Sequence, residues 1–356
     1  MRNSSPISAG IGRPETPRAL THGYLACLAV CATLFVPRLC RAQVAAVGYT
    51  AERFYPSAPG NSWSVMDDLK LAGPLGGAVS LVTGYSHHPV RVSLPGNSQS
   101  LNVVSDQAFA DVGLAILIDR FRFTLDIPNP LYGAGQSGNI VQQPDWRLQN
   151  SQVRVFTFTA PSVDVAHYPD RVADVRLGVD SRIWGSIDGP LRLGFSAQLF
   201  VPSGERANYI TDNTYRALLR VLYAGNWGIL NHAGYVGVHL RPRDDSPTLS
   251  SPSLGGPRGS ELVFGLAAAP EAPLSNGSLD RIGLGPEVFG ESAWKSAFGK
   301  YTTALEALFS AHYAHTNSHG AVFRLKAGVG CGLAAEFGAP TWRTVVGIEI
   351  SDRIHN

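Results

Sequence analysis

Apolar and polar residues alternate with a period of two along much of the chain. In one segment the apolar side chains are Leu191, Leu193, Phe195, Ala197, Leu199 and Val201, and the residues between them are Arg192, Gly194, Ser196, Gln198 and Phe200. The same alternation recurs in 174–183, 215–223, 323–331 and 342–350. Because successive side chains of a strand point to opposite faces, the pattern predicts strands with one apolar face and one polar or small face.

The pattern predicts about twelve such strands in an all-β protein. Their expected ranges are 76–92, 101–118, 121–132, 172–184, 191–202, 213–224, 229–241, 260–270, 280–291, 301–314, 320–333 and 341–352. Most of them exceed ten residues, which is the length a tilted membrane strand needs, whereas strands of soluble proteins average about 5 or 6 residues. We therefore expect an antiparallel, up-and-down transmembrane β-barrel in which 76–92 pairs with 341–352, because lipid offers no partner for an open sheet edge.

The links between the predicted strands alternate in length. The short set comprises 119–120, 185–190, 224–228, 271–279 and 315–318, and the longer set comprises 133–171, 203–212, 242–259 and 292–300. Aromatic residues such as Tyr215, Trp184 and Trp342 lie near strand ends. Short periplasmic turns, longer outer loops and aromatic girdles are typical of outer-membrane barrels. A soluble secreted sandwich remains the alternative fold.

The first 42 residues have the features of a cleavable signal peptide. Arg13 and Arg18 precede the apolar run 24–36, and Cys40-Arg41-Ala42 supplies small residues at the −3 and −1 positions of a cleavage site. We expect four parts: a signal peptide (1–42), an N-terminal segment that forms a periplasmic lid, a plug or a further strand (43–75), the barrel (76–352) and a tail (353–356).

Composition narrows the function classes. The chain has 29 Lys+Arg and 27 Asp+Glu, and loss of the leader leaves 24 basic and 26 acidic residues, so no basic excess points to nucleic acid. Loss of the leader also removes Cys27, Cys31 and Cys40, so Cys331 has no partner for an intrachain disulfide. A closed, hydrogen-bonded barrel is stable without such a covalent bond.

Several stretches resemble a known family in their order and spacing. They are 175–178, 194–204, 259–265, 285–290 and 303–308, together with Glu52-Arg53-Phe54-Tyr55-Pro56 and Gly60-Asn61-Ser62-Trp63 near the start. They resemble the N-terminal barrel of OmpA-family outer-membrane proteins of the myxobacterial type, over most of 47–352. In that family a peptidoglycan-binding domain usually follows the barrel. The present chain ends four residues after the last predicted strand, so wall anchoring is not carried over.

The polar faces of the strands carry charges that we expect to line the barrel interior. The acids are Asp174, Asp180, Glu261, Glu287, Glu306 and Glu349, and the bases are Arg176, Arg182, Arg192, Arg216, Arg220, Arg324, Lys326 and Arg343. Six acids against eight bases nearly cancel. Two interpretations stay open: a paired network that plugs a narrow barrel, which we favour, and a slightly cationic pore for small or anionic solutes.

No motif predicts a catalytic, cofactor-binding or metal-binding residue. His87 and His88 are adjacent on a strand, where they should point to opposite faces and form a poor chelate. His312 lies on an inward face with Glu306 and Ser310, but no nucleophile elbow surrounds it. The run 328–332 is rich in glycine, yet no helix follows it, so it is interpreted as strand rather than as a dinucleotide loop.

The sequence therefore favours an outer-membrane barrel with a structural or passive-pore role and no enzymatic activity. The expected partners are outer-membrane lipid and lipopolysaccharide, the barrel-insertion machinery and small solutes, with no nucleic acid. An adhesion protein that acts through its outer loops is the first alternative, and a barrel hydrolase is the second.

Overall fold

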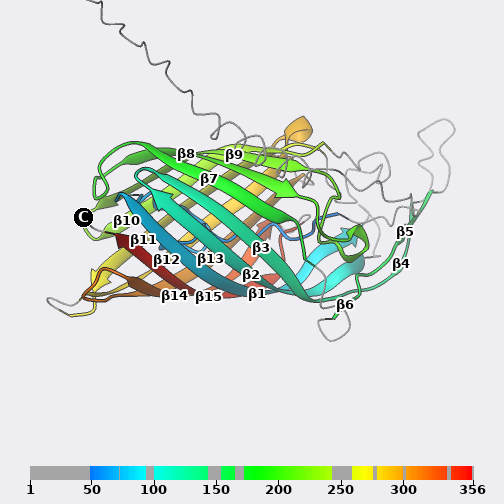
Figure 1. The fold of residues 1–356 in the computed structure, drawn as a ribbon. Coiled ribbons are helices and arrows are strands. Elements are labelled where there is room, and N and C mark those ends of the chain that lie inside the picture. Colours follow the sequence, from blue (N-terminus) through cyan, green and yellow to red (C-terminus); the bar gives the residue numbers. More distant parts are fainter. Residues whose placement is uncertain are drawn as a thin grey trace, which may run out of the picture. The chain divides into compact units, whose positions relative to one another are not determined.

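A computed structural model describes residues 49–71, 73–93, 100–142, 154–164, 172–242, 259–275, 279–299, 302–334 and 338–354. Within these residues the dominant element is one antiparallel sheet that closes into a barrel (Figure 1). Its twelve wall strands are β1 (Leu75–Ser93), β2 (Ser100–Ile118), β3 (Phe121–Ala134), β7 (Val175–Trp184), β8 (Arg192–Val201), β9 (Arg216–Trp227), β10 (Leu230–Leu240), β11 (Glu261–Pro273), β12 (Asp280–Ala293), β13 (Thr303–Thr316), β14 (Val322–Ala334) and β15 (Trp342–Ile354).

The barrel closes between its first and last strands. β1 pairs with β15 from Leu75 opposite Ile354 to His87 opposite Trp342. β2 pairs with both β1 and β3, and β3 pairs with β7, so each wall strand has two neighbours. The predicted fold class and the predicted closure of 76–92 on 341–352 are confirmed, because each wall strand is hydrogen-bonded to a neighbouring strand on both sides.

Side-chain burial follows the predicted alternation. In β8 every even-numbered residue from Arg192 to Phe200 is buried. Leu193 and Phe195, at odd positions, are exposed on the outer face. The outer face of the barrel carries large exposed apolar side chains on strand after strand, among them Val79, Leu81, Ile116, Phe123, Val221, Leu266, Phe309, Val329 and Ile348. The polar faces point inward, as the period-two pattern requires.

Strand connections are short at one end of the barrel and mostly longer at the other. The short-turn end holds Asp119-Arg120 between β2 and β3 and residues 228–229 between β9 and β10. Asp119 (φ 52°) and Gly228 (φ 64°) adopt left-handed backbone there, which tight hairpin turns need and which Asp and Gly tolerate. The long-loop end holds the connections 135–174, 202–215, 241–260 and 294–302. β1 begins and β15 ends at the short-turn end.

The longest connection contains strands of its own. β4 (Gly138–Gln142) pairs with β5 (Arg154–Phe158) in a separate two-stranded sheet, and β6 (Val163–Asp164) adds a short pairing to β3. These strands lie outside the ring of wall strands and leave the wall at twelve strands among the described residues.

Short 3-10 turns, η1 (Arg206–Asn208) and η3 (Trp294–Ser296), interrupt two of the long loops. No helix in the described part of the chain is both long enough and apolar enough to cross a membrane. The predicted signal peptide lies outside the described residues, as do most of the loop 242–259 and the last two residues of the predicted tail.

Candidate functional site in the barrel lumen

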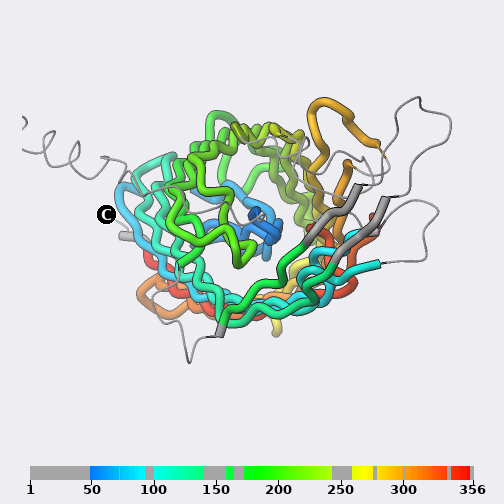
Figure 2. Tube along the Cα trace, turned by 90° about the vertical axis from the view of Figure 1, so that its right-hand side faces the viewer, coloured from blue at the N-terminus to red at the C-terminus, as the bar shows by residue number. Residues whose placement is uncertain are grey.

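The chain ahead of β1 lies inside the barrel rather than in its wall. Figure 2 views the barrel along its strands and shows this part of the chain, coloured blue, enclosed by the ring of strands. We call residues 49–71 the lumen segment. At the long-loop end the backbone N–H of Ala51 donates to the carbonyl of Tyr209 at 2.9 Å. Toward the short-turn end the carbonyl of Leu71 accepts from Nη2 of Arg182 at 2.8 Å, so the segment spans the lumen.

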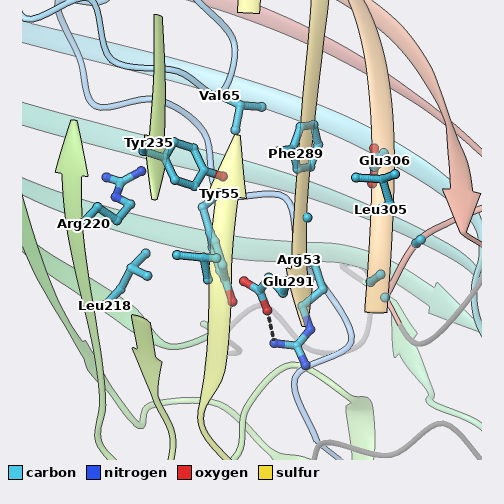
Figure 3. A pocket seen from close by; sticks show the side chains of 15 residues that line it. Arg53, Tyr55, Val65, Leu218, Arg220, Tyr235, Phe289, Glu291, Leu305 and Glu306 are labelled. Atoms are coloured by element: carbon cyan, nitrogen blue, oxygen red, sulfur yellow. Dashed lines mark hydrogen bonds and ion pairs between the residues drawn. The ribbon is translucent and has the colours of Figure 1, made fainter. Parts of the chain in front are cut away.

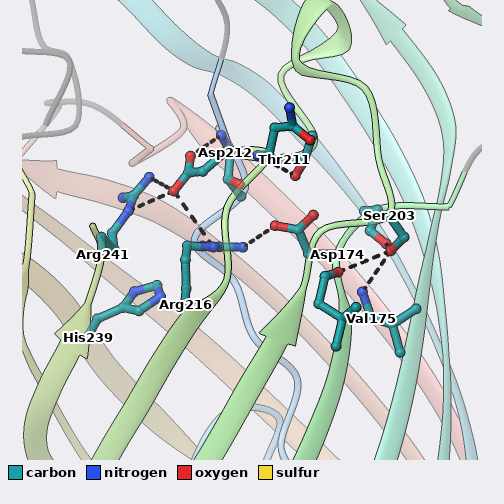
Figure 4. Close-up of polar contacts among 12 residues, drawn as sticks. Asp174, Val175, Ser203, Thr211, Asp212, Arg216, His239 and Arg241 are labelled. Atoms are coloured by element: carbon teal, nitrogen blue, oxygen red, sulfur yellow. Dashed lines mark hydrogen bonds and ion pairs between the residues drawn. The ribbon is translucent and has the colours of Figure 1, made fainter. Parts of the chain in front are cut away.

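An ion-pair network holds the outer part of the lumen segment. Nη1 of Arg53 lies 2.6 Å from Oε2 of Glu291 (Figure 3). It also lies 2.9 Å from Oε2 of Glu261. Arg241 lies 3.0 Å from the same oxygen of Glu261 and donates from Nε to Asp212 at 2.9 Å (Figure 4). These residues belong to the segment, β11, β12 and the connections after β8 and β10, so the network joins the lumen segment to four parts of the barrel.

Asp212 also anchors the segment backbone directly. Its Oδ1 accepts the N–H of Thr50 at 2.9 Å. Burial alone would raise the pKa of the Asp212 carboxyl, but the guanidiniums of Arg241 and Arg216 and the N–H of Thr50 outweigh burial and hold that pKa well below its usual range. The anchor is therefore a carboxylate over the whole neutral and mildly acidic range.

Glu287 of β12 holds the middle of the lumen segment. Its carboxylate accepts the backbone N–H groups of Ser64 at 2.9 Å, Val65 at 2.8 Å and Met66 at 3.2 Å, and the hydroxyl of Ser310 at 2.6 Å. Three successive N–H groups aimed at one carboxylate form a concave anion site like those built by helix ends and backbone nests. The irregular backbone of the segment thus obtains its hydrogen bonds from the wall.

Asp67 and Asp68 hold the inner part of the segment. Nη2 of Arg122 lies 2.7 Å from Oδ1 of Asp67 and 2.6 Å from Oδ2 of Asp180, with both acids and the guanidinium buried. The carbonyl of Asp68 accepts from Nε of Arg192 at 3.0 Å. The carboxylate of Asp68 accepts the backbone N–H of Lys70 at 2.9 Å.

Apolar contacts complete the packing of the segment against the wall. Phe54, Trp63, Val65, Met66 and Leu69 join one buried cluster with wall residues, among them Phe109, Leu222, Phe289, Leu308 and Val345. The rings of Phe54 and Phe109 lie 5.9 Å apart between centroids. The interior is therefore a mixed core in which charged pairs surround a central apolar contact.

The fourteen predicted interior charges all contribute to this arrangement. Thirteen are buried, and Arg182 is half-buried with its guanidinium on the carbonyl of Leu71. Some pair with one another between wall strands. Lys326 of β14 lies 3.1 Å from Glu349 of the neighbouring β15, and Arg343 of β15 lies 2.6 Å from Glu306 of β13, on the far side of β14. Others reach the lumen segment: Arg343 also lies 2.8 Å from Glu52.

Other interior charges escaped the sequence analysis. Asp111, Arg122 and Asp126 sit at inward positions of the predicted strands 101–118 and 121–132, so the parity of those strands could have identified them. Arg53, Asp67 and Asp68 lie in the lumen segment, where no period marks a face. Glu291 and Arg241 are the last residues of the predicted strands 280–291 and 229–241.

His239, Glu261 and Glu291 form a group whose ligand atoms all lie within 4.8 Å of one another. Such a trio could in principle hold a divalent cation. The two carboxylates are, however, already engaged by the guanidiniums of Arg53 and Arg241 at 2.6–3.0 Å. Their charge is therefore compensated within the protein, and the donor set fits an ion-pair network better than a metal site.

The remaining histidine candidates are placed differently from expectation. His87 and His88 were predicted to point to opposite faces, and this is wrong: their ring centroids lie 3.8 Å apart, because His88 has left-handed backbone (φ 51°) and the register with β2 shifts here. His312 lies 3.5 Å from Glu271, whereas Ser310 donates to Glu287. Ser310 and His312 therefore have different acidic partners.

Two cavities lie beside the lumen segment. The first, of about 20 Å³, is lined by Arg53, Tyr55, Arg220, Tyr235 and Glu306 among others (Figure 3). The second, of about 50 Å³, lies between the segment and the wall strands β2, β3, β7, β8 and β9. Tyr55 borders both cavities, so the segment does not fill the lumen evenly.

Several solved outer-membrane proteins resemble the chain distantly in structure. An outer membrane channel from Pseudomonas putida F1 is 14% identical, with a TM-score of 0.43 over 83% of this chain and 99% of that chain. An anion-selective porin from Comamonas acidovorans is 10% identical (TM-score 0.30; 78% and 98% covered), and a FadL homologue from Pseudomonas aeruginosa is 8% identical (TM-score 0.37; 88% and 100% covered). No family model and no curated protein matches the chain. Likenesses this distant carry no argument about function, which must come from the chain's own residues.

Proposed function

We propose that the protein is an outer-membrane channel for small solutes in which the lumen segment restricts passage. The apolar outer face supports the membrane location. On the outer face of the hydrogen-bonded wall, Val79 and Val221 are more than half exposed and Ile348 is nearly half exposed. In water such a continuous apolar surface would aggregate, whereas hydrocarbon stabilises it.

One observation carries the channel proposal. The lumen segment is held at its outer part by Asp212 in the connection after β8, and at its middle and inner parts by Glu287 and Arg122 of the wall. Hydrogen bonds and ion pairs to these groups can be exchanged for water, whereas an unbroken apolar core cannot be opened in this way. A charged lumen around a segment that is no part of the wall fits a restricted channel.

Planar-bilayer recordings of the purified, refolded protein test this proposal. We expect small, infrequent conductance steps from the wild-type barrel, because the segment occupies the lumen. A protein that inserts, as shown by heat-modifiable migration in unboiled gels, but never conducts under any condition would exclude the channel. That result would favour a plugged barrel with a structural role.

The motifs that resemble OmpA-family barrels support membership of that family as a finer proposal. The motif 52–56 supplies Arg53, which pairs with Glu261 and Glu291, and Glu52, which pairs with Arg343. Its residues therefore fasten the lumen segment. Outer-membrane lipid, lipopolysaccharide and the barrel-insertion machinery are the partners that a barrel of this kind requires. Ser310 and His312 form no nucleophile–base pair, which supports a role other than catalysis.

A further inference from the structure

Guanidiniums of four neighbouring wall strands face the inner part of the lumen segment. They are Arg122 of β3, Arg182 of β7, Arg192 of β8 and Arg220 of β9, and we call them the basic arc. In the register Arg122 lies opposite Asp180. Asp180 in turn lies opposite Ser196, and Ser196 opposite Arg220, so the first and last members of the arc share one level of the lumen. The pairing of the strands therefore sets the position of the arc.

The wall supplies the basic arc with very little negative charge. Nη2 of Arg122 lies 2.6 Å from Oδ2 of Asp180. The only other acid on the four strands is Asp126 of β3, which lies 3.9 Å from Arg176 outside the arc, and β8 and β9 carry no acid. Among the described residues, the other three members of the arc have no ion pair with a wall carboxylate.

The lumen segment supplies the carboxylate that the wall lacks. Oδ1 of Asp67 lies 2.7 Å from Nη2 of Arg122, and Oδ2 of Asp67 lies 3.4 Å from Nη2 of Arg220. The three side chains are buried, and the Arg220 guanidinium lies over the ring of Tyr235, 5.1 Å from its centroid (Figure 3). One carboxylate of the segment thus bridges two fixed guanidiniums of the wall.

Movement of the lumen segment would leave the basic arc without charge balance. Arg220 would lose its only carboxylate. Arg192 and Arg182 would lose the backbone carbonyls of Asp68 and Leu71. The whole arc would then share the single carboxylate of Asp180. Because an unpaired buried charge is costly, an anion that enters as Asp67 leaves offsets this cost, whereas a cation adds to it.

The group that occupies the basic arc indicates the chemistry of the solute. It is a carboxylate, which matches the planar fork of a guanidinium and forms strong, charge-assisted hydrogen bonds with it. Resting on the channel function proposed above, we propose that the basic arc binds small carboxylate anions, which take the place of Asp67 as they pass through the lumen. Arg122 and Arg220 hold the solute carboxylate, and the rest of the arc balances its charge.

Rescue of Asp67→Ala by formate tests the site in the full-length barrel without a conductance measurement. The substitution removes the carboxyl group alone, and formate is that group as a free ion, so it fits the space left. We expect urea unfolding in lipid vesicles to show a lower midpoint for the variant. Sodium formate should restore the midpoint, whereas formamide and sodium chloride at the same concentration should not.

A second substitution assigns the rescue to the basic arc. With Arg220→Met added to Asp67→Ala, the formate concentration that restores half of the loss should rise by about tenfold, because a charge-assisted hydrogen bond is gone. Arg281→Met in the same background is the control. It removes the same charge from β12, where Arg281 pairs with Glu271 and is half exposed, and it should leave the rescue unchanged.

Planar-bilayer recordings of Glu287→Gln test passage of the solute, because Glu287 holds the middle of the lumen segment. In a gradient of potassium formate the reversal potential should lie toward the formate equilibrium potential. Addition of Arg220→Met should shift it toward zero, and addition of Arg281→Met should not. This measurement does not use Asp67→Ala, so it decides the question if heat-modifiable migration shows that Asp67→Ala does not fold.

Two results would overturn the assignment. One is a folded Asp67→Ala barrel that formate restores no better than formamide or chloride do. The other is a conducting barrel that passes potassium in preference to formate. The urea measurement needs no conductance, so a barrel that conducts but is not restored refutes the site alone. A barrel that is restored but never conducts refutes the channel alone.

Discussion

The carboxylate of Glu287 on β12 accepts the backbone N–H of Val65 at 2.8 Å, in the middle of the barrel. The two residues are 222 positions apart in sequence, and the contact is repeated with the N–H groups of Ser64 and Met66. A single wall side chain thus satisfies three backbone donors that would otherwise be buried and unpaired. This makes Glu287 the contact whose loss should loosen the lumen segment most directly.

Glu287→Gln should increase conductance. An amide at this position turns one acceptor into a donor that faces other donors, and each unsatisfied buried donor costs about 1–3 kcal/mol. We expect the open fraction in planar bilayers to rise by about tenfold or more. Glu271→Gln is the control, because Glu271 lies on the same inner wall but bonds Asn231, Arg281 and His312, none of which belongs to the segment. Equal conductance in the two variants would show that the segment does not restrict passage.

Arg122→Met should destabilise the barrel strongly. The substitution leaves Asp67 and Asp180 buried without the guanidinium that lies 2.7 and 2.6 Å from them. Breaking a buried ion pair by removing one partner costs about 3–5 kcal/mol. Urea unfolding in lipid vesicles measures the loss, and Arg120→Met in the exposed turn before β3 should change the free energy of unfolding by less than about 0.5 kcal/mol. Similar values for both variants would contradict the structural importance of this network.

Leu81→Arg tests the outward face of β1. Leu81 is 44% exposed near the middle of the strand, where we expect hydrocarbon. A charge at the centre of the lipid face of a barrel costs about 2–4 kcal/mol, and near the interfaces the cost falls to about 0–1 kcal/mol. The comparison variant is Leu274→Arg, because Leu274 follows the end of β11 in a turn. Urea unfolding in vesicles measures the free energy of unfolding of both variants. An equal loss in the two would argue against a membrane belt at Leu81.

Mild acid should leave the lumen segment in place. The pKa of Asp212 is lowered, so its contribution to stability is complete above the ordinary aspartate pKa of about 3.9 and is lost only as the pH falls through the lower folded value. Conductance should therefore be unchanged between pH 7 and pH 5, and Asp212→Asn should raise it at both values. Opening of the wild type at pH 5 would contradict this prediction.

The alternation of residues was enough to predict the wall. Arg192 and Leu193 show why. Adjacent residues of a strand face opposite sides, so the parity of a position along the strand decides whether its side chain faces the lumen or the exterior. The lumen segment could not be placed in the same way. Its backbone is irregular, and its position depends on contacts such as Arg53 with Glu261, which are 208 residues apart and leave no local pattern. The prediction for His87 and His88 failed because a local shift in register cannot be seen in the residue types alone.

The central claim is that alternate side chains of the wall meet hydrocarbon while those between them face an enclosed lumen. Nitroxide labels on β14 test it most directly, at the native Cys331 and at Leu325→Cys, Ala327→Cys and Val329→Cys in a Cys331→Ser background, since all four positions are exposed on the outer face. In lipid vesicles we predict that oxygen relaxes these labels strongly while a water-soluble nickel complex does not reach those in the middle of the strand. Equal access of the nickel complex to all four labels would contradict the account.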